Sequence, residues 1–265
     1  MTAIPHSDTP GLVKTEQHGA ILVVTLARPQ KRNALNDPTV FELERIFSSL
    51  PDGTKAVVLQ GAGDHFSAGL DLSELKERDA EQGIAHSMGW HRAFEKIQFG
   101  MVPVVSVLKG AVVGGGLELA AATHVRVAET SAFYAFPEGQ RGIYVGGGAS
   151  VRVPRIIGVD RMMDMMLTGR TYNAAEGYQL GLSQYLVEPG QGPAKAMELA
   201  GKIAGNAGMT NFALIHALPR IADMDRSNGF MMEALMAGVA QAHPDAKQRV
   251  RDFLDKKAAK VVAPS

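Results

Sequence analysis

Two glutamates stand alone among apolar and glycine residues, and they are the strongest candidates for chemistry in this sequence. Glu118 is the one charged residue within residues 110–123, and Glu138 directly follows Phe136-Pro137. An ionised carboxylate is costly to bury, so such a residue is exposed, paired or kept for a reaction. Two carboxylates that share a water can act as general acid and base, because each raises the pKa of the other. The alternative for Glu138 is a salt bridge to Arg141.

Glycine clusters lie beside both glutamates. Gly114–Gly116 precedes Glu118 where a helix is expected to begin, and Gly146–Gly148 follows Glu138. Glycines at a helix start leave backbone N–H groups unshielded, and the helix dipole adds positive potential there. Such groups can stabilise an anion or a developing oxyanion. A tight turn, or close packing of a helix on a strand, explains the same glycines without any function.

A third segment, Phe66–Leu72, contains small residues that would let a ligand approach the backbone closely. Its Asp71 is also a plausible helix N-cap, a structural role that is compatible with a functional loop.

Several other kinds of site are excluded. The chain has no phosphate-binding P-loop motif, no dinucleotide-binding glycine motif and no nucleophile elbow. The absence of cysteine removes thiolate nucleophiles and cysteine-based metal sites. His86 and His91 are five residues apart, which places them on different faces of a helix, so we expect no metal site. Carboxylates therefore remain the main candidates for proton chemistry.

Composition limits the class of protein. The chain has 265 residues, of which 46% are hydrophobic, enough to bury a core as one large domain or two modest ones. Lys and Arg number 27, as do Asp and Glu, and this balance argues against nucleic-acid binding. No run of about 18 apolar residues exists, so we expect no membrane span. Met1–Lys14 lacks the apolar stretch of a signal peptide. The lack of cysteine fits a reducing compartment, and we expect a cytoplasmic protein.

The elements that must position the glutamates alternate between strand and helix. Strands are predicted where apolar residues run together, at residues 20–27, 56–60, 104–108 and 125–128. Helices are predicted at residues 38–50 and 73–98, and a mostly parallel sheet of βα units follows from this alternation. The later part is predicted to be helical at residues 161–168, 174–180, 193–204, 211–221, 230–242 and 246–257. We therefore expect an α/β core in residues 1–200 that holds the site, and a helical region in residues 201–265.

These features, in this order, resemble the crotonase (enoyl-CoA hydratase/isomerase) superfamily, of the type with two catalytic glutamates. The resemblance extends over most of the chain. It rests on the segments Arg28–Asn36, Phe66–Leu72, Gly114–Ala120, Pro137-Glu138, Leu167–Arg170 and Ala174–Leu182.

The resemblance implies a fold and an assembly. The fold is an α/β spiral of ββα units with a C-terminal helical region used in trimerisation, and many members are dimers of trimers, so a homohexamer is expected. It also implies an acyl-CoA thioester as the ligand, with no nucleic-acid or membrane partner. The backbone N–H groups of Leu70 and Gly115 match the pair that binds the thioester oxygen. Candidates for binding coenzyme A and the substrate are Lys31, Arg32, Ala34, Ala68, Asp71, Leu72 and Tyr144.

The resemblance also implies a reaction, because members with both glutamates hydrate 2-enoyl-CoA thioesters in fatty acid metabolism. Glu118 would hold and activate the water, and Glu138 would exchange the proton at C2. No metal and no redox cofactor is needed, since coenzyme A is part of the substrate. The alternatives are an enoyl-CoA isomerase, a thioester hydrolase, and a hydratase for a specialised acyl group. The last class includes methylthioacryloyl-CoA hydratase and hydroxycinnamoyl-CoA hydratase-lyase. A non-catalytic CoA-binding scaffold is a further alternative.

The sequence departs from the family pattern near the expected acyl pocket. Val145 stands where a proline is usual, Ala149 replaces a glycine, and Tyr144 adds a hydroxyl group. An aspartate that is common soon after the first glutamate is replaced by Thr123-His124. We expect Tyr144 and Trp90 to shape an acyl pocket that differs from that of an ordinary short-chain hydratase.

Overall fold

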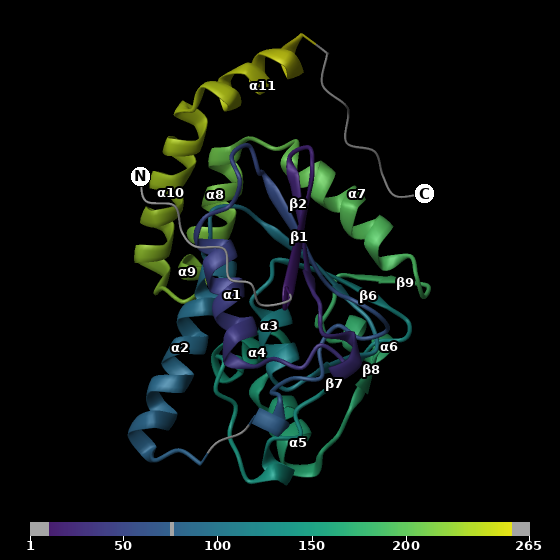
Figure 1. The fold of residues 1–265 in the computed structure, drawn as a ribbon. Coiled ribbons are helices and arrows are strands. Elements are labelled where there is room, and N and C mark those ends of the chain that lie inside the picture. Colours follow the sequence, from purple (N-terminus) through teal and green to yellow (C-terminus); the bar gives the residue numbers. More distant parts are fainter. Residues whose placement is uncertain (1–10, 75–76, 256–265) are drawn as a thin grey trace, which may run out of the picture. The chain divides into compact units, whose positions relative to one another are not determined.

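The computed structural model describes residues 11–74 and 77–255, which form a mixed α/β protein (Figure 1). The main sheet of this described part has six strands in the order β1-β2-β3-β4-β6-β9. β1 pairs antiparallel with β2, and the other neighbouring strands pair in parallel. The strands of this sheet are β1 (Val13–His18), β2 (Ile21–Leu26), β3 (Ala56–Gly61), β4 (Val104–Leu108), β6 (Val125–Glu129) and β9 (Tyr185–Val187).

A smaller sheet lies in the same part of the chain. It consists of β5 (Ala111–Val113), β7 (Phe133–Ala135) and β8 (Tyr172–Asn173). β5 and β7 pair in parallel, and β7 and β8 pair antiparallel. This sheet matters for the site because β5 runs directly into the glycines that precede Glu118, while β7 precedes Glu138.

Helices connect these strands and make up the C-terminal part. They are η1 (Pro29–Lys31), α1 (Asp37–Ser48), η2 (Leu72–Glu74), α2 (Ala80–Gln98), α3 (Gly115–Ala121), η3 (Gly139–Arg141), α4 (Ala149–Ile157), α5 (Val159–Thr168), α6 (Ala174–Gln179), α7 (Gly192–Ala204), α8 (Gly208–His216), α9 (Leu218–Ala222), α10 (Arg226–Ala242) and α11 (Pro244–Leu254). None of the helices in the described residues has the length and apolar character needed to cross a bilayer.

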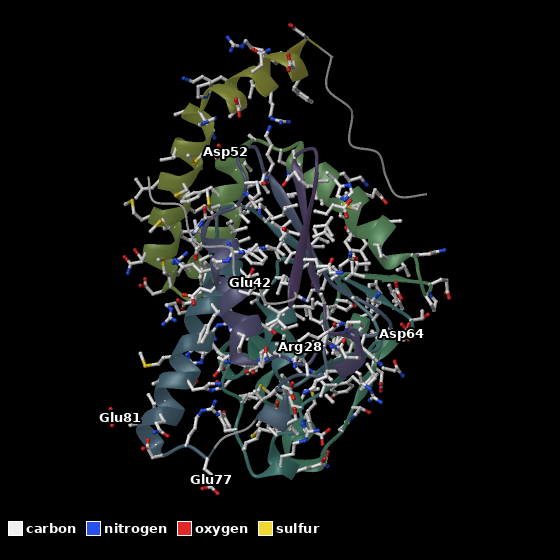
Figure 2. All side chains as sticks on the ribbon, in the orientation of Figure 1. Arg28, Glu42, Asp52, Asp64, Glu77 and Glu81 are labelled. Carbon is white, nitrogen blue, oxygen red and sulfur yellow. The ribbon has the colours of Figure 1, made fainter. Side chains whose placement is uncertain are left out.

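The chain divides into two compact units, one ending at Gly201 and the other beginning at Lys202. The first unit contains both sheets, and its core is built from strands that are buried along most of their length, such as β4. Helices α1 and α2 pack side by side in this unit (Figure 1). Charged residues of this unit differ in their exposure to solvent. Arg28 is buried, whereas Glu77 and Glu81 are exposed and point away from the ribbon (Figure 2).

The observed elements confirm the predicted strands, and the largest differences in helix bounds concern two segments. The helix predicted at residues 73–98 begins only at Ala80, because Asp79 and Gln82 cap each other's backbone N–H groups there. The single helix predicted at residues 211–221 is two helices, α8 and α9, with Pro219 at the start of the second. Proline cannot donate a backbone hydrogen bond, so Pro219 fits the first turn of α9, where a backbone N–H has no partner within the helix.

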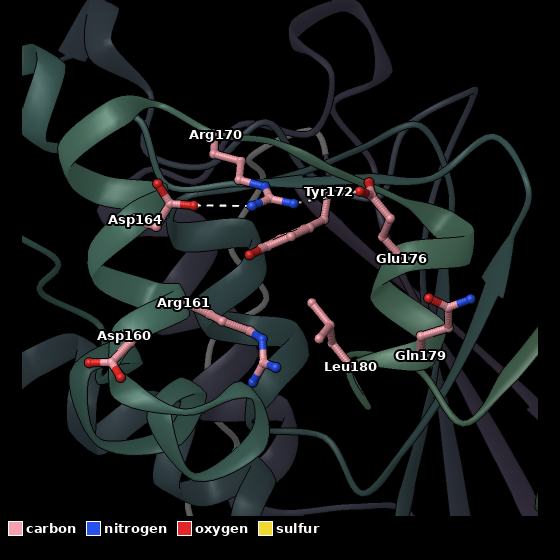
Figure 3. A pocket seen from close by; sticks show the side chains of 8 residues that line it. All are labelled: Asp160, Arg161, Asp164, Arg170, Tyr172, Glu176, Gln179 and Leu180. Carbon is pink, nitrogen blue, oxygen red and sulfur yellow. Dashed lines mark hydrogen bonds and ion pairs between the residues drawn. The ribbon is translucent and has the colours of Figure 1, made fainter.

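A cavity of about 340 Å³ is lined by residues of α5, β8 and α6, and Arg170 lies along one edge of it (Figure 3). Arg170 Nη1 lies 3.3 Å from Asp164 Oδ2, and its Nη2 lies 3.8 Å from Glu176 Oε1. The guanidinium carbon also lies 4.7 Å from the centre of the Tyr172 ring. Arg170 therefore joins the end of α5 to the start of α6 through contacts with three side chains.

We expect Arg170→Ala to lower the free energy of unfolding by about 0.5–1.5 kcal/mol, the sum of two half-exposed ion pairs and one cation–π contact. Arg170→Lys should recover only part of this, because an ammonium group cannot reach two carboxylates in the way a planar guanidinium does. Urea denaturation of both variants measures the effect. Gln179→Ala, which removes an uncharged side chain from the same cavity, is the matched control, and an equal loss in that variant would contradict the role of the charge.

Candidate active site

Both lone glutamates line one cavity of about 310 Å³ in the first unit. The remaining lining comes from Leu70, from residues of and just before α2 between Arg78 and Trp90, from Gly115, and from residues 143–147. Trp90 and Tyr144, which were expected to shape the pocket, are both part of this lining. The fold therefore brings together three of the segments singled out in the sequence, whose lining residues are at least 20 residues apart along the chain.

Glu118 lies in the first turn of α3 and is only 3% exposed. Its Oε1 accepts hydrogen bonds from the backbone N–H groups of Gly147, at 2.8 Å, and of Ala149, at 3.0 Å. Burial raises the pKa of Glu118, and these backbone donors together with the charge of Arg152 offset part of the rise. The second glycine cluster thus has a defined task, which is to hold the carboxylate of Glu118 in one orientation.

The lack of a side chain at Gly147 is part of this arrangement. A Cβ atom at this position would lie 2.9 Å from Glu118 Oε2 and 3.0 Å from the Phe94 ring. The loop is held from two sides, because Arg152 Nη1 donates to the carbonyl of Gly147 at 2.9 Å and Ser87 Oγ donates to that of Gly146 at 2.6 Å. Ser87 was not a candidate in the sequence, since a single serine on a polar helix carries no local signal.

Glu138 sits at the start of η3 and is 8% exposed. Its Oε2 is buried and has no hydrogen-bond partner among the described residues. The other oxygen, Oε1, faces Gly114, where φ is +51° and a Cβ atom would collide with the carboxylate. The contact with Arg141 is a main-chain hydrogen bond of 3.0 Å from the Arg141 N–H to the Glu138 carbonyl. The carboxyl group is therefore left available on the cavity side.

The pKa of Glu138 is raised to about 7, mainly by burial and also by the negative charge of Glu118, while its own backbone N–H and the charge of Arg141 lower it. Because the pKa values of both carboxyl groups are raised, each holds a proton at a higher pH than an exposed glutamate does. One group can then donate a proton while the other accepts one. This is the electrostatic arrangement expected for general acid and base catalysis.

The raised pKa of Glu138 predicts how the free energy of unfolding changes with pH. The native state binds the proton more tightly than the unfolded chain, so this stabilisation is complete below about pH 4.5 and is lost as the pH rises through about 7. Glu138→Gln removes the ionisation, so we expect it to raise the free energy of unfolding by roughly 1–3 kcal/mol at about pH 8 and by little at about pH 4. Urea denaturation at both pH values measures this. The exposed Glu188→Gln is the control, and a gain that is the same at both pH values would contradict the assignment.

Two backbone N–H groups converge beside the glutamates, at Leu70 and Gly115. A Cβ atom on Gly115 would lie 3.5 Å from the nitrogen of Leu70, and one on Gly69 would lie 3.1 Å from the nitrogen of Gly115. No hydrogen bond within the described residues occupies either N–H group. Gly115 is the first residue of α3, where N–H groups have no partner within the helix and the helix dipole is positive. The pair is therefore suited to bind a developing oxyanion.

The segment that carries Leu70 is held on both sides. The Leu35 N–H donates to the carbonyl of Gly69 and the Asp71 N–H donates to that of Leu35, both at 2.7 Å. On the other side, the Ser67 N–H donates to the carbonyl of Ala111 at 2.9 Å. Gly69 has a φ of +83°, and a Cβ atom there would lie 2.5 Å from the carbonyl oxygen of Val113. These contacts leave the Leu70 N–H as the unoccupied donor at the centre of the segment.

The residues expected to bind coenzyme A form a neighbouring group that is not part of the cavity lining. Ala68 lies beside Arg32, since the Ala68 N–H donates to the Arg32 carbonyl at 2.9 Å. Asp71 accepts from Arg28 Nη2 at 2.7 Å and from Lys31 Nζ at 3.1 Å, so one cation of the expected basic pair is engaged with it. Its Oδ1 also accepts from the Ser73 N–H at 3.1 Å, close to the N-cap role expected of it. The group outside the lining consists of Lys31, Arg32, Ala34, Ala68, Asp71 and Leu72.

Several polar residues at the site were missed in the sequence. His86 Nε2 lies 2.8 Å from Asp37 Oδ1, and Trp90 Nε1 donates to the same oxygen at 2.9 Å. Arg78 also lines the cavity, and its Nη2 lies 3.6 Å from Asp37 Oδ2. The described residues contain no group of three or more His, Asp or Glu placed to hold a metal ion. These polar residues looked like the solvated face of a charged helix, and only the packing of α2 against α1 brings them to the site.

The departure at Thr123-His124 has a structural explanation. The Thr123 and Ser106 hydroxyl groups lie 2.8 Å apart, and the Thr123 hydroxyl also donates to the carbonyl of Ala120 at 2.7 Å. His124 Nδ1 accepts from the Val104 N–H at 2.9 Å. Both residues therefore satisfy backbone groups between α3 and β4, away from the cavity lining.

Comparison with known proteins gives a consistent result. A sequence profile of the Enoyl-CoA hydratase/isomerase family matches residues 16–261. The Short-chain-enoyl-CoA hydratase of Clostridium acetobutylicum is 30% identical over 245 residues, which cover 91% of this chain and 94% of that protein. The Bacillus anthracis enoyl-CoA hydratase structure is 28% identical with a TM-score of 0.87, covering 93% of this chain and 97% of that one. A crystal structure from Rhodopseudomonas palustris, described provisionally as an enoyl-CoA hydratase, is 57% identical with a TM-score of 0.92, covering 96% of this chain and 98% of that one.

Proposed function

The chain belongs to the enoyl-CoA hydratase/isomerase family, within the crotonase superfamily, and from this we propose that it adds water across the double bond of a 2-enoyl-CoA thioester. One observation carries the proposal. Glu118 and Glu138, both with raised pKa values, line the same cavity beside two backbone N–H groups that nothing else occupies. The same set of groups provides an oxyanion hole, a base and an acid.

In the proposed mechanism, the N–H groups of Leu70 and Gly115 bind the thioester oxygen and stabilise the enolate that forms when C3 is attacked. Ionised Glu118, held by Gly147 and Ala149, accepts a proton from water as the oxygen bonds to C3. Protonated Glu138 delivers its proton to C2 as the carbonyl re-forms. The proton that Glu118 has gained then returns to the pair through solvent. One water is consumed, and the step needs no metal and no redox cofactor.

Product analysis with crotonyl-CoA tests this proposal. We expect the purified protein to form 3-hydroxybutyryl-CoA, with loss of the ultraviolet absorbance of the conjugated enoyl thioester. A shifted double bond would identify an isomerase, free coenzyme A a thioester hydrolase, and a released aldehyde from a longer substrate a hydratase-lyase. If the protein binds coenzyme A but converts no member of a panel of enoyl-CoA thioesters, it is a non-catalytic scaffold. Each of these outcomes contradicts simple hydration.

The pH dependence of hydration follows from the same pair. Glu138 must carry a proton to deliver it to C2, and its pKa is raised to about 7. We therefore expect kcat/KM for hydration to fall as the pH rises above about 7, and to fall again in acid where Glu118 also takes a proton. Initial rates between about pH 5 and pH 9 measure this profile. A rate that climbs steadily through the alkaline range would show that Glu138 acts in its ionised form, contrary to the mechanism.

We also propose that the protein assembles as a trimer or a dimer of trimers. In support, α10 of the second unit carries large apolar side chains that are more than half exposed, namely Phe230, Met231 and Leu235. Contiguous exposed apolar side chains are typical of a surface that another chain covers. The molar mass measured by light scattering tests this, and a monomer at micromolar concentration would contradict it.

A further inference from the structure

The cavity has a polar wall that the proposed hydration step does not use. This wall consists of three polar side chains from the side of α2, those of Arg78, His86 and Ser87. An alkyl chain would be better suited by an apolar lining. Ser87 is occupied by the carbonyl of Gly146. Arg78 and His86 do not position Glu118 or Glu138. The proposed hydration step therefore does not explain why these two side chains line the cavity.

Asp37, the first residue of α1, organises this wall. Its Oδ1 accepts hydrogen bonds from two groups of α2, His86 Nε2 at 2.8 Å and Trp90 Nε1 at 2.9 Å. Its Oδ2 lies 3.6 Å from Arg78 Nη2. One carboxylate therefore fixes the orientation of both rings and places a guanidinium group beside them at the rim of the cavity.

The guanidinium group of Arg78 keeps most of its donors available. The 3.6 Å contact with Asp37 is an ion pair that is longer than a hydrogen bond, and Asp37 is the one acidic partner of Arg78 among the described side chains. The Arg78 side chain is 25% exposed, so it is accessible from the cavity and partly shielded from bulk water. A planar guanidinium presents paired N–H groups that match a carboxylate in a two-pronged geometry.

The acyl chain is the part of the substrate that must face this wall. Leu70, Gly115 and the two glutamates fix the thioester carbonyl, C2 and C3 within the cavity, whereas the residues expected to bind coenzyme A lie outside its lining. The remainder of the cavity is left for the rest of the acyl group. An alkyl chain there would take water from Arg78 without replacing its hydrogen bonds, which is unfavourable. A terminal carboxylate would replace them.

We propose that the preferred substrate is a 2-enoyl-CoA thioester whose acyl chain ends in a carboxylate, and that Arg78, oriented by Asp37, binds this carboxylate. The proposal rests on the hydration activity inferred above and adds the class of acyl group. In this arrangement, His86 and Trp90 hold Oδ1 of Asp37, and Oδ2 faces the guanidinium group of Arg78.

A matched pair of substrates tests the proposal. Two 2-enoyl-CoA thioesters of equal chain length are compared, one ending in a carboxylate and the other in the isosteric, uncharged carboxamide. We expect the wild type to favour the carboxylate in kcat/KM by about ten-fold to one hundred-fold, as for a hydrogen bond to a charged group. Arg78→Met should abolish most of this preference, and Arg78→Lys should retain part of it.

The matched control is Arg92→Met. Arg92 is on the same helix, but it is exposed, pairs with Glu44 at 2.6 Å and does not line the cavity. Its replacement should leave the preference ratio unchanged. An equal loss of preference in Arg92→Met and Arg78→Met would show a general effect of charge on the protein's surface and would overturn the proposal.

A binding measurement separates this inference from the proposed function. The saturated forms of the two thioesters cannot be hydrated, and calorimetry should show tighter binding of the carboxylate form in the wild type but not in Arg78→Met. Hydration of both enoyl substrates without preference would overturn the inference and leave the proposed function standing. Arg78-dependent binding without hydration of any substrate would support the carboxylate site and overturn the hydratase. No hydration and equal affinities would overturn both.

Discussion

Replacing either glutamate of the cavity by glutamine is expected to slow hydration of an enoyl-CoA thioester by about 10²-fold to 10⁴-fold in kcat, as for the loss of a general acid or base. Glutamine has the shape of glutamate, and its amide oxygen can still accept the N–H groups of Gly147 and Ala149, so Glu118→Gln should keep the loop in place. KM should change little, because the groups that bind the thioester oxygen are backbone donors.

The two variants should differ in a second reaction that separates their roles. In heavy water, the wild type should exchange the C2 protons of a saturated acyl-CoA, since this step needs only the oxyanion hole and the group that reaches C2. We expect Glu138→Gln to lose this exchange and Glu118→Gln to keep it. Nuclear magnetic resonance follows the exchange, and the exposed Glu188→Gln serves as the control. Full hydration activity in either cavity variant would refute the proposal that both glutamates take part in hydration. Loss of exchange only in Glu118→Gln would show that Glu118, and not Glu138, exchanges the proton at C2.

The two glutamates of the proposed catalytic pair could be found in the sequence because each is the lone charge in an apolar stretch. A carboxylate in such a setting breaks the pattern of a buried element, and burial is what raises the pKa values of Glu118 and Glu138 in the structure. The glycines beside them were also visible, but their tasks were not. Gly114 makes room for Glu138 and Gly147 makes room for Glu118, contacts between residues at least 24 apart in the numbering of this chain.

The strands that could be predicted are those that are largely buried on both faces. β3 and β4 are almost wholly buried and appear in the sequence as continuous apolar runs. β1 was missed because five of its six residues are exposed at the edge of the sheet, so it has no apolar pattern. β5, β7 and β8 have two or three residues each, and they are strands only because they pair with each other.

The polar wall of the cavity could not be predicted for a similar reason. Asp37 and His86 are 49 residues apart, and when each segment is considered alone, Asp37 fits the start of one helix and His86 the polar face of another. Their contact depends on how α1 packs against α2, which no local pattern reports. Asp71 shows the same limit, because the sequence allowed a ligand contact or an N-cap, whereas the structure adds an ion pair with Arg28, 43 residues away.

Asp71→Asn is expected to lower the free energy of unfolding by about 3–5 kcal/mol, because it removes the counter-charge of a buried arginine. The side chains of Arg28 and Asp71 are 9% and 5% exposed, with Nη2 and Oδ2 2.7 Å apart. Arg28 also donates to the carbonyl of Ala34 at 2.6 Å, so its guanidinium cannot move out to water without losing this hydrogen bond. Urea denaturation measures the loss, and Asp64→Asn, at an exposed position, is the control (Figure 2).

The sign of the pH dependence distinguishes this ion pair from a simple packing effect. Hydrogen bonds from Ser73, Arg28 and Lys31 outweigh burial and hold the pKa of Asp71 well below its usual range. The stabilisation is therefore present above the pKa of the unfolded chain, about 3.9, and is lost as the pH falls toward the lower native value. The difference between wild type and Asp71→Asn should shrink in acid, whereas a loss due to packing alone would stay constant.

A double variant tests whether the destabilisation comes from the arginine left without its partner. Arg28→Met combined with Asp71→Leu replaces both charges by apolar groups, and it should cost less than Asp71→Asn alone, since no charge then remains buried without its main partner. Activity gives an independent readout, because Leu70 precedes Asp71 and its N–H is half of the proposed oxyanion hole. In Asp71→Asn, kcat should fall even under conditions where the variant is fully folded. Unchanged kcat in the folded variant would show that the ion pair stabilises the first unit without positioning Leu70.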